Sequence, residues 1–486
     1  MSKAARNRAA YNEKQQAKRE REELARKNAK IRKVTAIVTI SLIAALIVAF
    51  IVGVCVYNYR MDSGEYLRSE TAASSKNIDV DGAMMNYYYN DVLNTFVDYY
   101  GSYVQYYGFD PTGDAKYQSF SDGQTWFDYF MSGAKSNVTG YLALNEGAAA
   151  EGISLSEAEK SALETRVSGL DTTLYGRGVK QSDIYNAKLI EALAYKYQAI
   201  KQDEFAPTKA EINERYASEP EKYQSVDYIS YTFDWSEEKM TQSAAKIAAA
   251  RLSDAKTVEN FKSILAELLR SDSPDLTDED IETYITSYTT TGALYTEGSE
   301  LSEWAFGAKY GDTKIIEDES NSKTTAYILT KAAVRDESKT VNVRHILFTS
   351  DKYGSTEKAR AKAEEVLAEF ESGDRSIESF SNLALAYTED ENTCYNGGLY
   401  ENLANGVTLT NFDEWCFFGT RKSGDCEIIE TTRGIHIVYY ESDGLLNWEA
   451  SVADAIISDR FNELDEKLLE EYPVSFDDIL IAQIPS

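Results

Sequence analysis

The sequence predicts an α+β protein in which one N-terminal transmembrane helix carries a helical region and two related sheet-containing domains. Three observations support this fold class: an uncharged apolar run over residues 34–57, helical spacing of aromatic residues over 78–215, and apolar–polar alternation from about residue 223. The 486 residues, of which 43% are hydrophobic, suffice for more than one folded core and exclude a mainly disordered chain.

The apolar run Val34–Tyr57 is long enough to cross a membrane, because its 24 residues would form a helix of about 36 Å. Residues 1–33 carry 12 Lys and Arg against 4 Glu, whereas the whole chain has a formal charge of −30. Basic flanks stay in the cytoplasm, so we expect residues 1–33 inside and everything after Tyr57 outside the cell membrane. The run exceeds the apolar core of a cleaved signal peptide, which favours an uncleaved single-pass anchor.

After a linker over residues 58–77, residues 78–215 are expected to form a helical, chaperone-like domain. From Met84 to Phe109, apolar residues recur at helical spacing, namely Val92, Phe96, Tyr100, Val104 and Tyr107. Ser156 with Glu159, and Thr208 with Glu211, have the spacing of capping boxes that begin helices. The tyrosine-rich stripe has two interpretations, ordinary core packing or a groove that binds client proteins.

The chain then repeats itself, which predicts one α+β domain over residues 216–337 and a second over 338–445. The strand pattern at Val226 matches that at Val341, and the segment around Trp304 aligns without gaps to the segment around Trp415. A third match pairs TTAYIL with RGIHIV, in the same order along the chain. Three ordered matches indicate a duplicated domain. Residues 446–486 are expected to form a C-terminal helix that returns to the helical domain.

Both histidines of the chain, His345 and His436, fall within apolar strands of the second copy. Ser230 and Tyr327 stand at the matching places of the first copy. A histidine in an apolar strand is commonly a hydrogen-bonded core residue. The restriction of both histidines to one copy favours a functional site there.

The second copy resembles the parvulin-type peptidyl-prolyl cis-trans isomerases over about 105 residues. An amphipathic helix over Ala361–Phe370 and five motifs carry this resemblance: Val343–Phe348, Phe380–Asp390, Asn396–Tyr400, Asn411–Phe417 and Thr431–Tyr440. With its anchor and helical region, the whole chain resembles the membrane-anchored extracytoplasmic foldases of the PrsA/SurA type.

The resemblance implies a four-stranded antiparallel sheet with helices in each copy, the first copy being degenerate. It implies His345, Asp390 and His436 as catalytic residues. It also implies a proline-binding pocket lined by Leu399, Phe412 and either Thr408 or Leu409, with Phe417 behind them. Rotation about an X-Pro bond changes no covalent bond, so neither a cofactor nor a metal is expected.

Three cysteines lie outside the membrane, namely Cys394, Cys416 and Cys426, and any single pairing leaves one of them free. A Cys394–Cys416 disulfide is the expected pairing, because both residues would flank one face of the parvulin-like domain.

The leading interpretation is a foldase that isomerises X-Pro bonds of secreted or surface proteins and holds unfolded or translocating clients. The alternative is a non-catalytic extracytoplasmic chaperone whose parvulin-like modules only bind. A surface-structural protein explains the anchor and the acidity but not the placement of the histidines. The acidic composition disfavours nucleic acid as a partner, and nothing in the sequence indicates the oligomeric state.

Overall fold

The computed structural model describes residues 3–121, 123–236, 240–390 and 392–485, which form two compact units. Unit 1 comprises residues 1–138, 171–187 and 475–486, and unit 2 comprises residues 139–170 and 188–474. The long helices α4 (Trp126–Ala150) and α6 (Gln181–Phe205) contribute to both.

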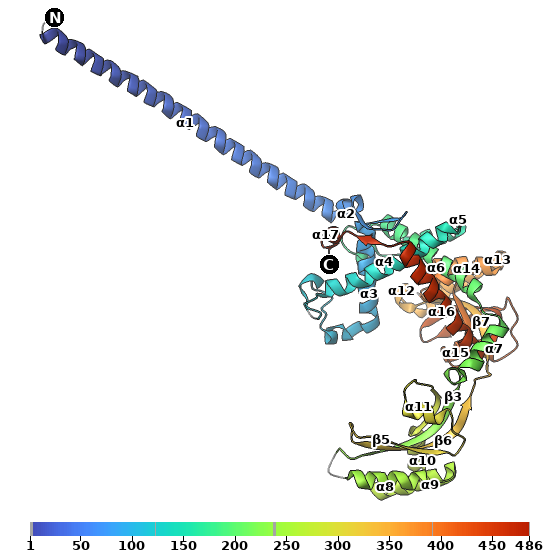
Figure 1. Ribbon diagram of the computed structural model, residues 1–486. Helices are drawn as coiled ribbons and strands as arrows, with labels where there is room; N and C mark the ends of the chain where they lie inside the picture. The colour runs from blue at the N-terminus through green and yellow to red at the C-terminus, as the bar shows by residue number, and fades with distance from the viewer. Residues whose placement is uncertain (1–2, 122, 237–239, 391, 486) are drawn as a thin grey trace. The chain divides into compact units, whose positions relative to one another are not determined.

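Unit 1 begins with the helix α1 (Lys3–Asp62), which contains the predicted membrane segment (Figure 1). A stretch of this helix, Ala10–Asp62, is long and apolar enough to cross a membrane, and it is the one such helix among the described residues. The rest of unit 1 has a small antiparallel sheet of order β11-β1-β2. Its further elements are α2 (Glu65–Ser69), β1 (Thr71–Ser74), β2 (Asp79–Asp81), α3 (Gly82–Tyr100), η1 (Gly101–Tyr107), η2 (Ala115–Tyr117), η3 (Thr172–Tyr175), β11 (Ser475–Phe476) and α17 (Asp478–Ile481).

The helix predicted over Met84–Phe109 is interrupted at Gly101. This residue has φ 51° and ends α3, after which the chain continues as the 3-10 helix η1. A positive φ is readily adopted by glycine and stops regular helix propagation. The tyrosine-rich stripe is consequently divided: Tyr87, Tyr88 and Tyr89 lie in the core, whereas Tyr99, Tyr103 and Tyr106 are exposed.

In unit 2, the ends of α4 and α6 pack with the C-terminal helix α16 (Asn447–Glu471) around Tyr197, Leu468 and Tyr472. The helices α5 (Glu157–Ser168) and α7 (Lys209–Ser218) begin at the two predicted capping boxes, in which the Ser156 and Thr208 hydroxyls accept from the backbone amides of Glu159 and Glu211. Both capping predictions are confirmed.

The first sheet of unit 2 has the strand order β4-β3-β6-β5, all antiparallel, and α8, α9 and α10 cover one of its faces (Figure 1). The elements of this region are η4 (Pro220–Tyr223), β3 (Ser225–Asp234), α8 (Gln242–Ser253), α9 (Val258–Asp272), α10 (Asp278–Ser287), β4 (Thr289–Leu294), α11 (Glu300–Ala305), β5 (Thr313–Asp318) and β6 (Lys323–Val334).

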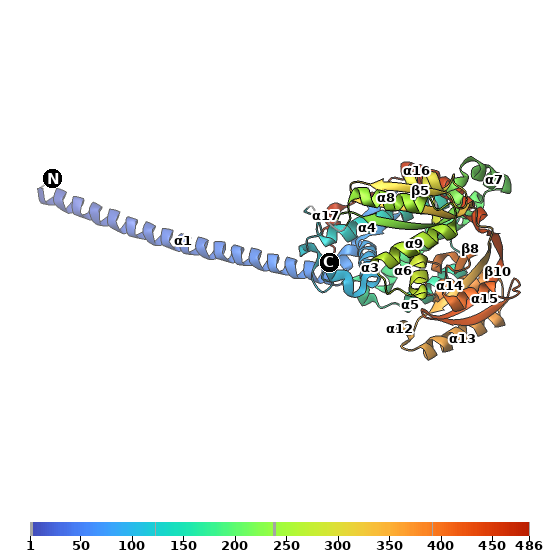
Figure 2. The ribbon, with the colours of Figure 1, turned by 90° about the horizontal axis from the view of Figure 1, so that it is seen from below.

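The second sheet has the equivalent order, β8-β7-β10-β9, and its helices α12 to α15 are grouped around it (Figure 2). Its elements are β7 (Lys339–Phe348), α12 (Ser350–Tyr353), α13 (Thr356–Ser372), α14 (Ile377–Tyr387), η5 (Cys394–Asn396), β8 (Leu399–Ala404), α15 (Thr410–Phe417), β9 (Cys426–Thr431) and β10 (Gly434–Leu446). The α+β fold class with two four-stranded antiparallel sheets is confirmed.

The strand registers correct one of the residue matches between the copies. His345 pairs with Val438 and Leu347 pairs with His436 in the second sheet, whereas Ser230 pairs with Tyr327 in the first. If Ser230 corresponds to His345, the counterpart of His436 is therefore Thr325, the partner of Thr232. Tyr327 was chosen wrongly, because sequence similarity alone did not define the strand register.

The predicted Cys394–Cys416 disulfide is wrong, since all four cysteines lie within the described residues and no disulfide links any of them. Cys416 is buried in the core cluster that surrounds α15, whereas Cys394 is buried in η5, which packs against α14. Burial raises the pKa of the Cys416 and Cys426 thiols to about 12, so both are protonated and unreactive at neutral pH.

Candidate active site

The two histidines occupy the central strands of the second sheet and face each other on the same side of it. The distance between His345 Nδ1 and His436 Nδ1 is 3.3 Å, and both side chains are buried. They come together because β7 and β10 pair directly in antiparallel register. His345 lies opposite Val438 and therefore diagonally from His436 on the same face of the sheet. Diagonal neighbours on paired strands are about 7–8 Å apart, which long or aromatic side chains can bridge.

Asp390 lies at the other edge of His345, in the loop that follows α14. Its Oδ2 is 2.8 Å from His345 Nε2 and accepts hydrogen bonds from the hydroxyls of Thr393, at 2.9 Å, and Tyr400, at 3.0 Å. Burial opposes the negative charge, but the bonds from His345, Thr393 and Tyr400 outweigh it, so the pKa of Asp390 is held below its ordinary value. Asp390 is therefore a carboxylate at neutral pH.

His436 is held as a neutral ring. Burial lowers its pKa to about 3, and the neighbouring His345 and Arg433 add to the effect while Asp390 opposes it. Its Nε2 is 2.9 Å from the Thr431 hydroxyl. With His345 donating from Nε2 to Asp390, its Nδ1 accepts from His436 Nδ1–H, and His436 Nε2 then accepts from Thr431. One hydrogen-bonded chain thus runs from Thr431 to Asp390.

A cavity of about 260 Å³ opens beside this chain of hydrogen bonds. Its apolar wall includes Phe412, whose ring meets both imidazoles edge to face with centroids 5.7 Å from His345 and 5.5 Å from His436. The other lining residues are Leu347, Tyr400, Val407, Thr408, Leu409, Thr431 and Arg433, together with His345, Asp390 and His436. The cavity therefore combines an apolar wall with a polar wall of defined hydrogen bonding.

The comparison with family descriptions supplies the identity of this part of the chain. Residues 327–442 match the family described as the PPIC-type PPIase domain. The second sheet and its helices are a parvulin-type peptidyl-prolyl isomerase domain. The match covers both histidine strands, the Asp390 loop and α15, so every residue of the cavity described above lies inside the PPIase domain.

Three solved structures are similar to between 56% and 60% of this chain. They are PrsA of Bacillus anthracis, at 12% identity and a TM-score of 0.20, covering 57% of this chain and 96% of that one; PrsA of Bacillus subtilis, at 16% and 0.19, covering 60% and 88%; and a structure from a study of SurA-like chaperones of Campylobacter jejuni, at 15% and 0.18, covering 56% and 96%. No curated protein matches the chain.

Seven of the eight residues that the sequence suggested are in or beside the cavity of the PPIase domain. His345, Asp390 and His436 form the hydrogen-bonded chain, while Thr408, Leu409 and Phe412 line the cavity. Thr408 and Leu409 were alternatives for one position in the pocket wall, and both of them line the cavity. Phe417 is half-buried and packs in the core cluster behind Phe412.

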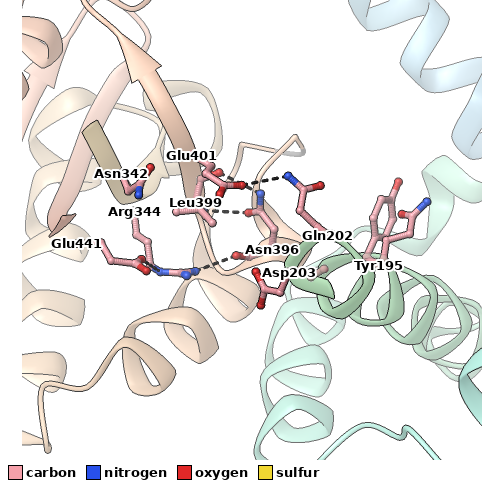
Figure 3. A pocket seen from close by; sticks show the side chains of 11 residues that line it. Tyr195, Gln202, Asp203, Asn342, Arg344, Asn396, Leu399, Glu401 and Glu441 are labelled. Carbon is pink, nitrogen blue, oxygen red and sulfur yellow. Dashed lines mark hydrogen bonds and ion pairs between the residues drawn. The ribbon is translucent and has the colours of Figure 1, made fainter. Parts of the chain in front are cut away.

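Leu399 is the exception, because it lines a different cavity of about 400 Å³, which also includes Arg344 and Tyr195 (Figure 3). In β8 the next residue, Tyr400, faces the histidines instead and stacks on His345 with a centroid distance of 4.7 Å. Successive strand residues point to opposite faces of a sheet, so the prediction was displaced by one position. Tyr400 takes the place that Leu399 was expected to fill.

Sequence reasoning also missed Thr393 and Thr431, whose hydroxyls contact the Asp390 carboxylate and the His436 ring. Thr431 is the last residue of β9, directly before the turn that leads into β10 and five positions before His436. Its place in the TTRG turn was a usable signal. Thr393 carried none, because the irregular backbone that aims it at Asp390 has no periodic pattern.

Proposed function

We propose that this chain is a membrane-anchored extracytoplasmic foldase whose PPIase domain isomerises X-Pro bonds in secreted or surface polypeptides. The observation that supports it best is the hydrogen-bonded chain His436–His345–Asp390 lying against the apolar wall of one cavity. In this proposal Phe412, Leu409 and Thr408 contact the proline ring. His345, Asp390 and His436 orient the carbonyl group that precedes the proline.

The chemistry follows from the two walls of the cavity. A planar amide is stabilised by resonance, and the barrier to its rotation is about 18–20 kcal/mol. Rotation reduces the dipole of the carbonyl, so a dry apolar wall favours the twisted form over the planar one. An enzyme gains rate only from interactions that are stronger in the transition state, and a fixed hydrogen-bond network beside an apolar wall supplies such a difference.

Asp390 acts electrostatically in this proposal and does not attack the substrate. Its Oδ2 already faces three partners, His345, Thr393 and Tyr400, and its Oδ1 lies 3.4 Å from Asn392 Nδ2. A carboxylate whose lone pairs are engaged in this way is a poor nucleophile. Its negative charge instead fixes the orientation of the His345 ring.

Replacing Phe412 by alanine is expected to lower kcat/KM by about tenfold to a hundredfold, or roughly 1.4–2.8 kcal/mol. The buried ring forms the apolar wall against both imidazoles, and its loss admits water to the proline-binding side. The measurement is isomerisation of a prolyl peptide by the full chain in detergent. Phe418→Ala, which removes an exposed ring of the same size one residue beyond α15, should leave the rate unchanged.

Isomerase activity also decides between this proposal and a chaperone that only binds. A wild-type chain that binds unfolded polypeptides but shows no acceleration of prolyl isomerisation would favour the binding-only function. The first sheet has Ser230 and Thr325 at the positions of the two histidines, so it is expected to contribute no turnover in either case.

The proposed anchor is the apolar part of α1, with the basic residues 1–33 in the cytoplasm and everything after Tyr57 outside. Protease added to intact cells is expected to remove all material after Tyr57 and to leave a short N-terminal fragment protected. Protection of the whole chain, or a mature N-terminus near Cys55, would contradict this topology. A cytoplasmic protein probed in the same cells confirms that the membrane stayed sealed.

Client polypeptides are proposed to bind the exposed tyrosines of unit 1. The most exposed of these on α3, η1 and η2 are Tyr99, Tyr103, Tyr106 and Tyr117, with 71–87% of each side chain accessible. Tyrosine offers a large apolar ring at a small cost in side-chain entropy, which suits binding to many different sequences.

A further inference from the structure

The loop that contains Asp390 is hydrogen-bonded to two helices that lie outside the PPIase domain. The described residues of this loop are 388–390 and 392–398, which include Asp390 and Thr393. Helices α5 and α6 precede the family match at residue 327 by more than a hundred residues. Within unit 2, two separate contacts join these helices to the loop. Both contacts involve loop residues that are within two positions of Thr388 or Thr393, the threonines that are hydrogen-bonded to Asp390.

The first contact comes from α5. Arg166 Nη1 donates a 2.8 Å hydrogen bond to the carbonyl oxygen of Thr388, the buried residue that begins the loop. The Thr388 hydroxyl in turn accepts from the backbone amides of Leu347, at 3.0 Å, and Asp390, at 3.3 Å. Arg166 therefore holds the residue that ties the Asp390 backbone to strand β7.

The second contact comes from α6. The Tyr395 hydroxyl donates to Glu191 Oε2 at 2.8 Å, and the Tyr395 ring stacks on Tyr195 with centroids 4.8 Å apart and planes 4° from parallel. Figure 3 shows Tyr195 on its helix next to the Asn396 end of the loop. Glu191 is only 3% exposed and also pairs with Lys188 at 2.7 Å.

A buried carboxylate is costly unless its partners compensate for lost hydration, so the placement of Glu191 needs an explanation. Among the described residues its Oε1 has no hydrogen-bond partner, whereas its Oε2 accepts hydrogen bonds from the Tyr395 hydroxyl and from Lys188 Nζ. Tyr395 follows Thr393 by two residues, and the Thr393 hydroxyl touches both Asp390 Oδ2 and His345 Nε2. Fixing Tyr395 therefore fixes the Thr393 hydroxyl against the catalytic pair.

We infer that α5 and α6 position the catalytic loop of the PPIase domain, with Arg166, Glu191 and Tyr395 as positioning residues for isomerisation. The inference rests on the proposed roles of Asp390 and His345. None of the three residues lines the histidine cavity. Their effect passes through Thr388 and Thr393, so their loss changes the geometry at Asp390 while leaving the substrate-contacting wall intact.

The decisive variant is Tyr395→Phe, which keeps the ring that stacks on Tyr195 and removes only the hydroxyl. We expect kcat/KM for a prolyl peptide to fall about fivefold to tenfold, with peptide affinity unchanged, as small displacements of reacting groups commonly cause. The matched control is Tyr197→Phe, which removes a 2.7 Å bond from a buried tyrosine on α6 to the Glu151 carboxylate, away from the loop. It should keep the wild-type rate.

The same comparison applies to α5. Arg166→Met removes the donor to Thr388 while keeping the length of the side chain, and it is expected to lower kcat/KM by a similar factor, with partial recovery in Arg166→Lys. Its control is Arg460→Met, since Arg460 Nη1 likewise donates to a backbone carbonyl, that of Phe205, at 2.6 Å.

A second readout follows from the composition of the chain. His345 and His436 are its only histidines, so imidazole NMR signals of the full chain in detergent report on the candidate site alone. Tyr395→Phe and Arg166→Met should shift the His345 ring signals, and the two controls should not. Unchanged rates and unchanged imidazole signals in both variants would overturn the inference. An inactive wild type would instead contradict the proposed function, and the imidazole signals would still decide whether the helices set the site geometry.

Discussion

Replacing Asp390 by alanine is expected to lower kcat/KM about a hundredfold, equivalent to roughly 2.7 kcal/mol, without unfolding the PPIase domain. His345 Nε2, the Thr393 hydroxyl and the Tyr400 hydroxyl all lose the same acceptor oxygen. The hydrogen bonds through both imidazoles then no longer end at a carboxylate, and the orientation of the His345 ring is no longer fixed.

Asp390→Asn sharpens this test because it keeps the volume and removes only the charge. We expect it to be almost as inactive as the alanine variant, since an amide cannot accept from three donors at one oxygen in the same way. Asp425→Ala, in an exposed turn of the same domain, is the control for general effects of removing a carboxylate. Full activity in a folded Asp390→Ala protein would show that the catalytic assignment is wrong.

The second large effect is a loss of stability at low pH that is caused by the buried His436 ring. The pKa of His436 is about 3 in the folded chain because the ring is buried, whereas the ordinary value is 6.5. Below pH 6.5 the unfolded chain binds a proton at this residue and the folded chain does not, so the free energy of unfolding falls as the pH falls. This contribution is complete above pH 6.5 and amounts to a loss of about 3 kcal/mol by pH 4.5.

Hydrogen exchange of the β10 amides next to His436 measures the local stability, since the chain has more than one folding unit. The loss between pH 7 and pH 4.5 should be about 3 kcal/mol smaller in His436→Gln, which keeps polar atoms toward His345 and Thr431. The contributions of all other titratable groups to the pH dependence cancel when the two proteins are compared. An imidazole signal of His436 that titrates near pH 6.5 would contradict the prediction directly.

The parts of the fold that periodic patterns encode could be predicted from the sequence. The two capping boxes, the duplicated sheets and the apolar N-terminal helix each depend on local spacing, and the structure contains all of them. The end of α3 at Gly101 could not be read in this way, because the aromatic spacing continues through it. A single positive φ then outweighs a regular pattern.

The candidate site likewise has residues that the sequence could predict and residues that it could not. His345 and His436 were identifiable because both histidines of the chain fall in apolar strands of one copy, but Leu399 was chosen where Tyr400 faces the site. A strand reverses its faces at every residue, so an error of one position exchanges inside for outside. The contacts of Arg166 and Glu191 with the Asp390 loop were beyond sequence reasoning, since they join segments separated by about two hundred residues.

The small sheet of unit 1 also sets the order in which the chain can fold. Strand β11 pairs with β1, and the side chains of Ser74 and Ser475 meet across 401 positions of sequence. Segments that emerge first during synthesis must therefore wait for almost the entire remaining chain before this sheet is complete. The second sheet of unit 2, whose strands pair within residues 339–446, can close earlier. The PPIase domain can therefore be complete before unit 1, the unit that contains α1.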